Sequence, residues 1–508
     1  MIRKNIYRWH RIIGLVTVIP VIFWTLSGLM HPFMSHWFKP KIAKEFIVQK
    51  PVKKEKLKLS IQEVLKQDSI TQLKNFRVVS FNHKTYYQVK RVAGKLAYYD
   101  AATGKELENG DVLYAEWMAR ELSKDSTSTI KSITVQSDFD GQYKFVNRLL
   151  PVYKVEFEKD NGLEVFVDTE TTRMATFNTN ARKAFIWFFD VFHNWSFLDA
   201  IVSTNIRLAV MILLLSIIIL STVSGLVIYG ILWGKFKKPR SADDKVGILK
   251  KYHRQIGIWV SFVTLTFAFS GAYHAAKKFT ADDRNKFSYE PIFKIEELGV
   301  NPFALKVDSS KVLNIGLSKI KDKAYYTVFF KKEEEQTPEP AFFDTQTGEE
   351  LKDGNLLYAK YLANKFSNLS ETAIAKEPKE GEQETMADCC EPGADVANAQ
   401  VNDKNLLKSE WLTKFDREYG FVNKRLPVVK IAYDTPEKTT YYIETATGKL
   451  AAKVENADRR EGYSFAILHK FLFMDWAGKD VRDIVTMLSA LGVLVVSLFG
   501  LALFLKVK

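Results

Sequence analysis

Apolar residues are concentrated in four long blocks that are separated by polar sequence. The blocks contain no formally charged residue and run over 12–30, 208–233, 255–276 and 484–505. A helix needs roughly 20 apolar residues to span the hydrocarbon core of a bilayer, and each block has about that length. A buried helix of a soluble protein is the alternative for any one block. Four such blocks together predict a membrane protein with four spanning helices.

The first block also resembles a signal peptide, because Arg3, Lys4 and Arg8 precede it. However, the block is longer than a typical signal-peptide core, and it ends at residues 29–32 without a small-x-small cleavage site. A similar block starts near His253, in the middle of the chain, where a signal peptide cannot act. The sequence therefore predicts that the first block is retained as a helix.

Basic residues flank the apolar blocks and contribute to a formal net charge of +14. Residues 234–251 carry seven Lys or Arg against two Asp, and residues 1–11 carry four Lys or Arg. Because cytoplasmic loops are enriched in Lys and Arg, both termini and this loop are predicted to be cytoplasmic. The long segments, roughly 33–200 and 278–480, then lie outside. Basic flanks are common beside membranes, so no nucleic-acid partner is predicted.

The blocks and their flanks divide the chain into predicted segments. These are a cytoplasmic tail (1–11), a helix (12–32), an external domain (33–204), a second helix (205–233), a basic cytoplasmic loop (234–251), a third helix (252–277), a second external domain (278–482) and a fourth helix (483–506). The predicted fold class is a membrane α-helical protein with two external α+β domains.

The second half of the chain repeats the first. The matched stretches are 9–14 with 252–257, 27–31 with 270–274, 99–107 with 343–351, 145–151 with 421–427, and 192–193 with 468–469. Each half is predicted to run helix, external domain, helix, and to begin and end in the cytoplasm. Repeats of this parallel kind are related by an axis along the membrane normal.

The external segments mix strand and helix patterns. An Asp-x-x-Thr-Gly motif between apolar runs indicates a turn between strands, because glycine tolerates positive φ. Residues 165–168 and 441–444 are predicted to be strands that enter turns. Residues 112–122 and 356–366 are predicted to be helices, because their apolar residues recur at intervals of three and four.

One segment, 372–405, has no counterpart in the first half. It is acidic and rich in Glu, Pro, Gly and Ala, a composition typical of disorder. It contains the only two cysteines, Cys389 and Cys390. A strained vicinal disulfide and a soft-metal site are possible roles, but inert thiols are the favoured interpretation. Without other cysteines, the folded domains have no disulfide framework and no four-cysteine metal site.

Six of the eight histidines occupy matched positions near the predicted membrane edges. They are His10 and His253 at the inner ends of the first and third helices, His31 and His274 at the outer ends, and His193 and His469 before the second and fourth helices. The inner and outer histidines are 21 residues apart, or about 31 Å along a helix, which is close to the hydrocarbon thickness. Only His36 and His83 lack a match.

Histidines at a membrane edge can simply cap helices, but three matched pairs favour a functional role. Neutral imidazole binds haem iron without bringing a charge into lipid. Zinc normally takes carboxylate or thiolate ligands as well, and the first and third apolar blocks contain neither. No Cys-x-x-Cys-His motif is present, so a haem would be noncovalent and b-type. Arg11 and Arg254 are candidates to pair with haem propionates or to anchor the helices at the cytoplasmic face; both interpretations stay open.

The duplicated pattern resembles the PepSY-associated transmembrane proteins. Each copy has a helix that begins His-Arg-x-x-Gly and ends Ser-Gly, then an external domain, then a histidine before a second helix. The resemblance covers nearly all of the chain except 372–405. It implies PepSY-like external domains, a bacterial inner-membrane location and b haem bound by His10, His253, His193 and His469. His31 and His274 are less uniform in that family, so their predicted role depends on the pattern in this sequence.

The family includes ferri-siderophore reductases, so the expected function is an electron conduit with two or three haems that reduces a ferric complex at the external face. His10 and His253 are expected to share an inner haem. His31 with His193 and His274 with His469 are candidate outer pairs, and pairing between the halves is equally open. The 18-residue loop 234–251 has no dinucleotide-binding motif, so a quinol or a separate reductase would donate electrons. The alternative is a non-enzymatic module whose PepSY-like domains bind a peptidase, a peptide or an envelope partner.

Overall fold

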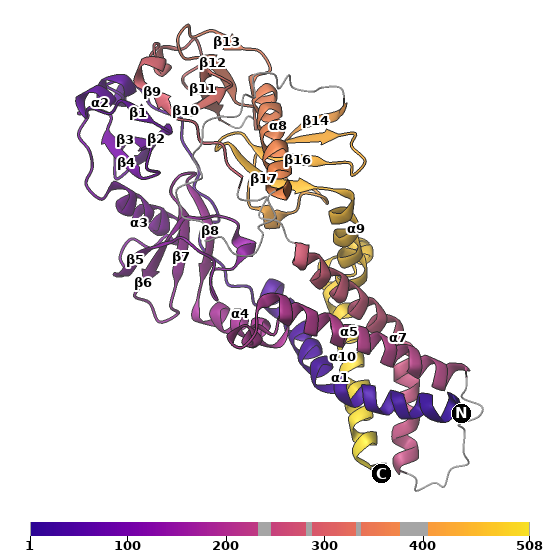
Figure 1. The fold of residues 1–508 in the computed structure, drawn as a ribbon. Helices are drawn as coiled ribbons and strands as arrows, with labels where there is room; N and C mark the ends of the chain where they lie inside the picture. The colour runs from indigo at the N-terminus through magenta and orange to yellow at the C-terminus, as the bar shows by residue number, and fades with distance from the viewer. Residues whose placement is uncertain (1, 232–244, 281–286, 332–336, 376–404, 507–508) are drawn as a thin grey trace. The chain divides into compact units, whose positions relative to one another are not determined.

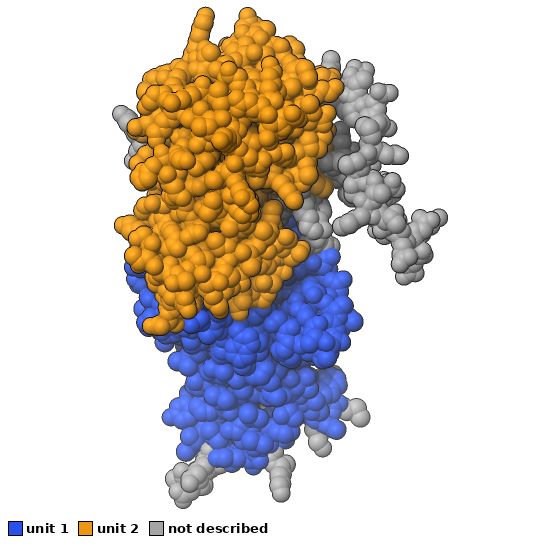
Figure 2. Space-filling view, turned by 90° about the vertical axis from the view of Figure 1, so that its left-hand side faces the viewer, with its two compact units in different colours: residues 1–41, 179–281, 457–508 blue, residues 42–178, 282–456 orange. Residues whose placement is uncertain are grey.

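The structure is a computed structural model that describes residues 2–231, 245–280, 287–331, 337–375 and 405–506. The chain forms two compact units, which Figure 2 colours separately. The helical unit comprises residues 1–41, 179–281 and 457–508, and the sheet unit comprises residues 42–178 and 282–456. Each unit therefore takes segments from both halves of the chain.

Four long helices form the helical unit (Figure 1). They are α1 (Ile2–Pro32), α5 (Thr204–Leu226), α7 (Lys245–Lys277) and α10 (Lys479–Lys506). All four are long and apolar enough to cross a membrane, which confirms the predicted spanning helices. Helix α1 packs against α5 and α10, and α7 packs against the same two helices. A side chain at Gly492 of α10 would bring its Cβ within 2.7 Å of Val260 on α7, so glycine permits this close approach.

Three π-helical turns interrupt the regular helices of this unit. They are Phe33–Trp37 after α1, Val227–Ile231 after α5, and Phe465–His469 before α10. A shorter helix leads into each outer histidine: α4 (Asn180–Phe192) precedes His193, and α9 (Asn456–Ser464) precedes the turn that ends at His469. π-helical turns are rare in proteins overall, and those that occur often lie at functional sites. The positions of these turns beside the predicted histidines indicate that the functional site lies in this unit.

Antiparallel sheets build the other unit. In the first half, β2 (Asn75–Phe81), β3 (Lys84–Lys90) and β4 (Leu96–Asp100) form one sheet, and β5 (Ile130–Gln136), β6 (Val152–Phe157), β7 (Glu164–Asp168) and β8 (Arg173–Asn178) form another. In the second half, β10 (Val312–Ile320), β11 (Lys323–Phe330), β12 (Ala341–Asp344) and β13 (Glu350–Leu351) form one sheet, and β14 (Leu406–Leu412), β15 (Val428–Tyr433), β16 (Thr440–Glu444) and β17 (Lys449–Val454) form another. Strands β1 (Gln72–Leu73) and β9 (Phe293–Lys294) pair with each other. Helices α2 (Ile61–Gln67), α3 (Gly110–Ser123) and α8 (Gly354–Ala375) complete the unit.

The predicted elements of these domains are confirmed where the structure describes them. The predicted strands are β7 and β16, and the predicted helices lie within α3 and α8. Helix α8 runs to Ala375, so it includes 372–375 of the segment predicted to be disordered. Residues 376–404, with Cys389 and Cys390, lie outside the described residues, as do residues 234–244 of the basic loop.

The two halves share a hydrophobic core within the sheet unit. Phe76 and Tyr87 of the first half are buried in one cluster with Phe293 and Tyr326 of the second. The edge strands β2 and β10 also meet, and Asn314 joins them with both ends of its amide. Its Oδ1 accepts the Val78 N–H at 2.9 Å, and its Nδ2 donates to the Val78 carbonyl at 3.2 Å. This pairing covers strand edges that would otherwise be open to other chains.

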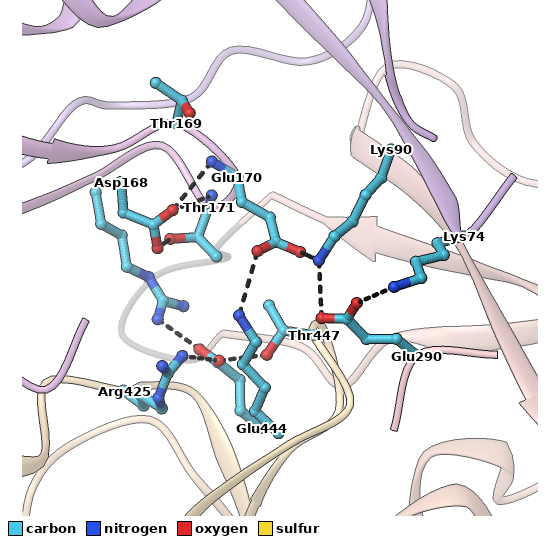
Figure 3. Close-up of polar contacts among 12 residues, drawn as sticks. Lys74, Lys90, Asp168, Thr169, Glu170, Thr171, Glu290, Arg425, Glu444 and Thr447 are labelled. Carbon is cyan, nitrogen blue, oxygen red and sulfur yellow. Dashed lines mark hydrogen bonds and ion pairs between the residues drawn. The ribbon is translucent and has the colours of Figure 1, made fainter. Parts of the chain in front are cut away.

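Ion pairs cross between the two hairpin turns that end β7 and β16 (Figure 3). Arg173 of the first half pairs with Glu444 of the second, and Lys449 of the second half lies 3.2 Å from Glu170 of the first. Glu444 is fully buried and also accepts from Arg425 at 2.7 Å. Burial alone would raise the pKa of Glu444, but the two arginines hold it well below its usual range. The turns thus lock together through opposite charges that each half supplies to the other.

We expect Glu444→Gln to destabilise the sheet unit, because the substitution leaves two guanidinium groups without their buried carboxylate. Removing one partner of a buried ion pair costs about 3–5 kcal/mol. Urea unfolding of the full-length protein in detergent, followed by circular dichroism, measures this loss. Asp434→Asn is the control, because Asp434 and its partner Lys438 are exposed, and we expect a change below about 0.5 kcal/mol. Equal losses for the two variants would contradict the buried-network interpretation.

A second expectation concerns acid stability. Burial tends to raise the pKa of Glu170, but Lys449 and Lys90 outweigh it and lower the pKa from 4.5 to about 2. Because the folded pKa is the lower one, this carboxylate stabilises the fold fully above pH 4.5. That contribution, up to about 3 kcal/mol, is lost as the pH falls from 4.5 towards 2. The difference in unfolding midpoint between wild type and Glu170→Gln should therefore shrink across this range; a constant difference would show that Glu170 keeps its ordinary pKa.

Candidate functional site

His10 and His253 meet at one end of the helical unit. Their ring centres are 6.4 Å apart, and α1 and α7 supply one ring each. A neighbouring helix holds each ring through Nδ1. His10 Nδ1 lies 3.1 Å from the Ser221 carbonyl and 2.9 Å from Ser224 Oγ on α5. His253 Nδ1 lies 3.1 Å from the Val496 carbonyl on α10.

Glycines give the inner pair its space. A Cβ at Gly225 would lie 3.0 Å from His10 Cε1, and a Cβ at Gly500 would lie 3.3 Å from His253 Cε1. Both glycines line a cavity of about 180 Å³ that also contains the two imidazoles. Gly14, on the same cavity wall, has no atom within 4 Å of the place where a Cβ would stand. Larger side chains at these positions would fill the cavity or displace its histidines.

Polar residues complete the inner cavity. Tyr229, in the π-helical turn after α5, presents its ring edge to His10 at 6.3 Å and to His253 at 6.1 Å. The predicted propionate partners Arg11 and Arg254 both line the cavity. The cavity therefore combines two imidazoles, a phenol and two guanidinium groups with small and apolar side chains.

His193 and His469 form a second pair of the same dimensions. Their ring centres are also 6.4 Å apart, and the ring planes are nearly perpendicular at 87°. Serines of α1 and α7 hold them: His193 Nδ1 lies 3.0 Å from Ser27 Oγ, and His469 Nδ1 lies 3.1 Å from Ser270 Oγ. Burial, together with the neighbouring histidines, lowers the pKa of His193 to about 3 and that of His469 to about 4. Both imidazoles are therefore neutral at physiological pH.

His31 and His274 lie beside this outer pair without joining it. Phe189 contacts His31 at 5.8 Å and stacks on His193 at 4.4 Å. Phe465 is the equivalent residue of the second half: it stacks on His274 at 4.6 Å and on His469 at 4.7 Å. His274 also lies 2.7 Å from the Glu461 carboxylate. Among the outer histidines, the 6.4 Å ring contact joins the two halves, from His193 to His469.

The two unmatched histidines take no part in either pair. His36 lies in the π-helical turn after α1, where Nδ1 is 3.3 Å from Asp483 and 3.4 Å from Asp480. His83 belongs to the sheet unit and occupies the turn between β2 and β3 with a positive φ of 64°.

Helix geometry places the pairs at opposite ends of the bundle. The serine that holds each outer histidine follows the inner histidine of the same helix by 17 residues, from His10 to Ser27 and from His253 to Ser270. At 1.5 Å per residue this separation is about 26 Å, slightly less than the hydrocarbon core of a bilayer.

Each pair has the dimensions of two ligands on one metal. An imidazole nitrogen binds a metal at about 2.0–2.1 Å, so two imidazoles on opposite sides of one metal have ring centres about 6 Å apart. Every imidazole hydrogen bond described above uses Nδ1 and none uses Nε2, a pattern that is usual in metal-binding histidines. Among the described residues, no three His, Cys, Asp or Glu side chains are grouped as metal ligands. Two imidazoles alone fit a metal that brings its other ligands, as haem iron does.

Several residues of these sites were not singled out in the sequence. Ser27 and Ser270 belong to the repeated Ser-Gly motif, and that motif did not predict their hydrogen bonds to the outer histidines. Phe189 and Phe465 each precede an outer histidine by four residues, so the repeated Phe-x-x-x-His spacing was a usable signal. Tyr229 has no such signal, because the corresponding residue of the second half, counted from Gly225 and Gly500, is Phe504.

These features define a four-helix membrane protein with an α+β unit formed by both halves. The bundle has one histidine pair at each end, and each pair is a candidate ligand set. The model of the family described as the PepSY-associated TM region matches residues 8–506, and the chain belongs to this family. No curated protein matches the chain.

Proposed function

We propose that this protein is a haem b electron conduit of the bacterial inner membrane that reduces a ferric complex at the external face. The main support is the presence of two histidine pairs at opposite ends of the bundle. In each pair the imidazole ring centres are 6.4 Å apart. We propose two haems, because there are two histidine pairs and His31 and His274 belong to neither.

The chain's own residues would bind and orient the two groups. His10 and His253 hold the inner group, His193 and His469 hold the outer one, and the residues on Nδ1 fix the four ring orientations. Arg11 and Arg254 supply positive charge for propionate carboxylates at the inner end. Haem, when bound, supplies reversible one-electron chemistry. Two groups are needed because the ends of the bundle are about as far apart as the membrane is thick.

The direction of transfer follows from the charge pattern. The basic loop and termini support a cytoplasmic inner end, so the inner pair would receive electrons from a quinol or a separate reductase. The outer pair would deliver them to a ferri-siderophore or another ferric chelate at the external face. In this proposal the two halves are parallel repeats about an axis along the membrane normal.

A competing proposal is a non-enzymatic module whose PepSY-like domains bind a peptidase, a peptide or an envelope partner. The sheet unit favours it in one respect: among its described residues, the only histidine is His83, so this unit contributes nothing to the imidazole pairs. The two proposals differ in a simple observable, because the conduit is coloured when purified and the binding module is colourless.

We expect purified protein to contain two noncovalent, low-spin b haems per chain, measured as the pyridine haemochrome after extraction with acid acetone. His10→Ala and His253→Ala should each remove the same single haem, and His193→Ala and His469→Ala should each remove the other. His31→Ala and His274→Ala should retain both haems, because their rings are not in either pair. His83→Ala is the control in the sheet unit. Colourless wild-type protein from haem-replete cells contradicts the proposal.

The conduit also predicts which step each pair serves. In membrane vesicles, His193→Ala should lose ferric-chelate reduction at the external face while the inner haem is still reduced by its donor. His10→Ala should lose both reactions, because electrons enter there. Right-side-out and inverted vesicles distinguish the two faces, and His83→Ala should behave as wild type. If His193→Ala keeps full ferric reduction, the outer pair is not on the electron path.

A further inference from the structure

A backbone turn of unusual conformation follows each outer histidine. Trp195 and Phe471 lie two residues after His193 and His469, and their φ values are +55° and +52°. This left-handed region is uncommon for bulky side chains, which pay strain energy there. Each residue is the N-cap of the 3₁₀ helix that follows it, and both side chains are buried. The same costly conformation at the same offset in both halves indicates a shared task.

Stacked aromatic rings hold both turns against the long helices. Trp195 stacks on Trp24 of α1 at 5.2 Å, with 19° between the ring planes. Phe471 stacks on Phe267 of α7 at 5.5 Å, with 22° between the planes. Offset-stacked rings at this distance attract each other beyond the gain from burial. The attraction, about 0.5–1.5 kcal/mol, offsets part of the strain of about 1–3 kcal/mol in the left-handed turn.

The same helix faces also hold the imidazoles. Ser27 lies three residues after Trp24, one turn along α1, and its hydroxyl contacts His193 Nδ1. The Trp24 indole Nε1 donates to the His193 carbonyl at 2.9 Å. On α7, Ser270 follows Phe267 by three residues and contacts His469 Nδ1 in the same way. Each outer histidine is thus held by a serine at its ring nitrogen. The residue two positions later, Trp195 or Phe471, stacks on the same long helix.

We propose that Trp195 and Phe471 are positioning residues of the outer pair. Each fixes the turn that follows its histidine and thereby the plane of the imidazole, so the two stacked pairs set the perpendicular arrangement of the rings. This inference rests on the proposed function where it concerns haem, but the positions of the imidazoles can be tested without it.

The indole N–H of Trp195 provides a control within the residue. Its Nε1 is buried and has no hydrogen-bond partner within the described part of the chain. Trp195→Phe therefore keeps a ring for stacking, as Phe471 does in the other half, and removes a buried donor that the fold does not use. Trp195→Leu keeps apolar bulk and the strained backbone but removes the stack. Trp187→Leu is the matched control, since Trp187 is 59% exposed.

The first measurement is carbethoxylation of His193 by diethyl pyrocarbonate, read by mass spectrometry on folded, full-length protein produced in haem-deficient cells. Trp195→Leu should raise the rate by about 2- to 12-fold, which corresponds to a stacked pair worth about 0.5–1.5 kcal/mol. Trp195→Phe and Trp187→Leu should react as wild type does. An unchanged rate in Trp195→Leu overturns the inference, and so does a Trp195→Phe rate equal to that of Trp195→Leu, because the indole N–H would then be the active group.

The second measurement is the ferric electron paramagnetic resonance spectrum of the same variants with haem bound. Perpendicular imidazole planes give a low-spin signal of larger anisotropy than parallel planes do. Trp195→Leu should shift the outer signal at unchanged haem content, and Trp195→Phe should restore it. A fold defect alone would lower haem content instead of moving the signal. If wild-type protein carries no haem, the proposed function fails, and the carbethoxylation rates still decide the positioning role.

Discussion

The bundle depends on one constraint: an imidazole ring removed from water needs a partner for its nitrogen. Each of the four paired histidines satisfies Nδ1 on a different segment of the chain, so the hydrogen bonds run between elements and not along them. His10 on α1 reaches α5, and His253 on α7 reaches α10. His193 and His469 reach back from the connecting segments to α1 and α7. The same bonds that satisfy the rings therefore fix the neighbours of each helix and the separation of the two rings in each pair.

Sequence patterning predicted the elements well because their causes are local. Uninterrupted apolar blocks identify the four helices, and the short apolar runs before Asp168 and Glu444 identify the strands. The inner pair was also expected, since His10 and His253 occupy the same level of equivalent helices. The outer pairing was not determined by sequence. It depends on the path of the connecting segments and on Phe189 and Phe465, whose rings contact His31 and His274 on one side and the paired imidazoles on the other.

In the sheet unit, ion pairs join the two halves of the chain, as the imidazole hydrogen bonds join the helices of the bundle. Arg173 and Lys449 each reach a carboxylate of the opposite half, and neither half contains its own complete set of partners. Pattern analysis does not find such contacts, because Glu170 and Glu444 each look like an ordinary polar residue in a turn. Only the arrangement of the two hairpin turns shows that Glu444 is buried and therefore must be neutralised.

Because each imidazole pair takes one ring from each half, biosynthesis imposes an order on the assembly of the two sites. A nascent chain shorter than 253 residues has neither pair complete. A chain of 253–468 residues has both histidines of the inner pair but only one of the outer pair. Val496, which anchors His253, emerges later still. A product truncated before residue 469 therefore lacks both a complete outer pair and the carbonyl that holds His253, even where its first three long helices are present.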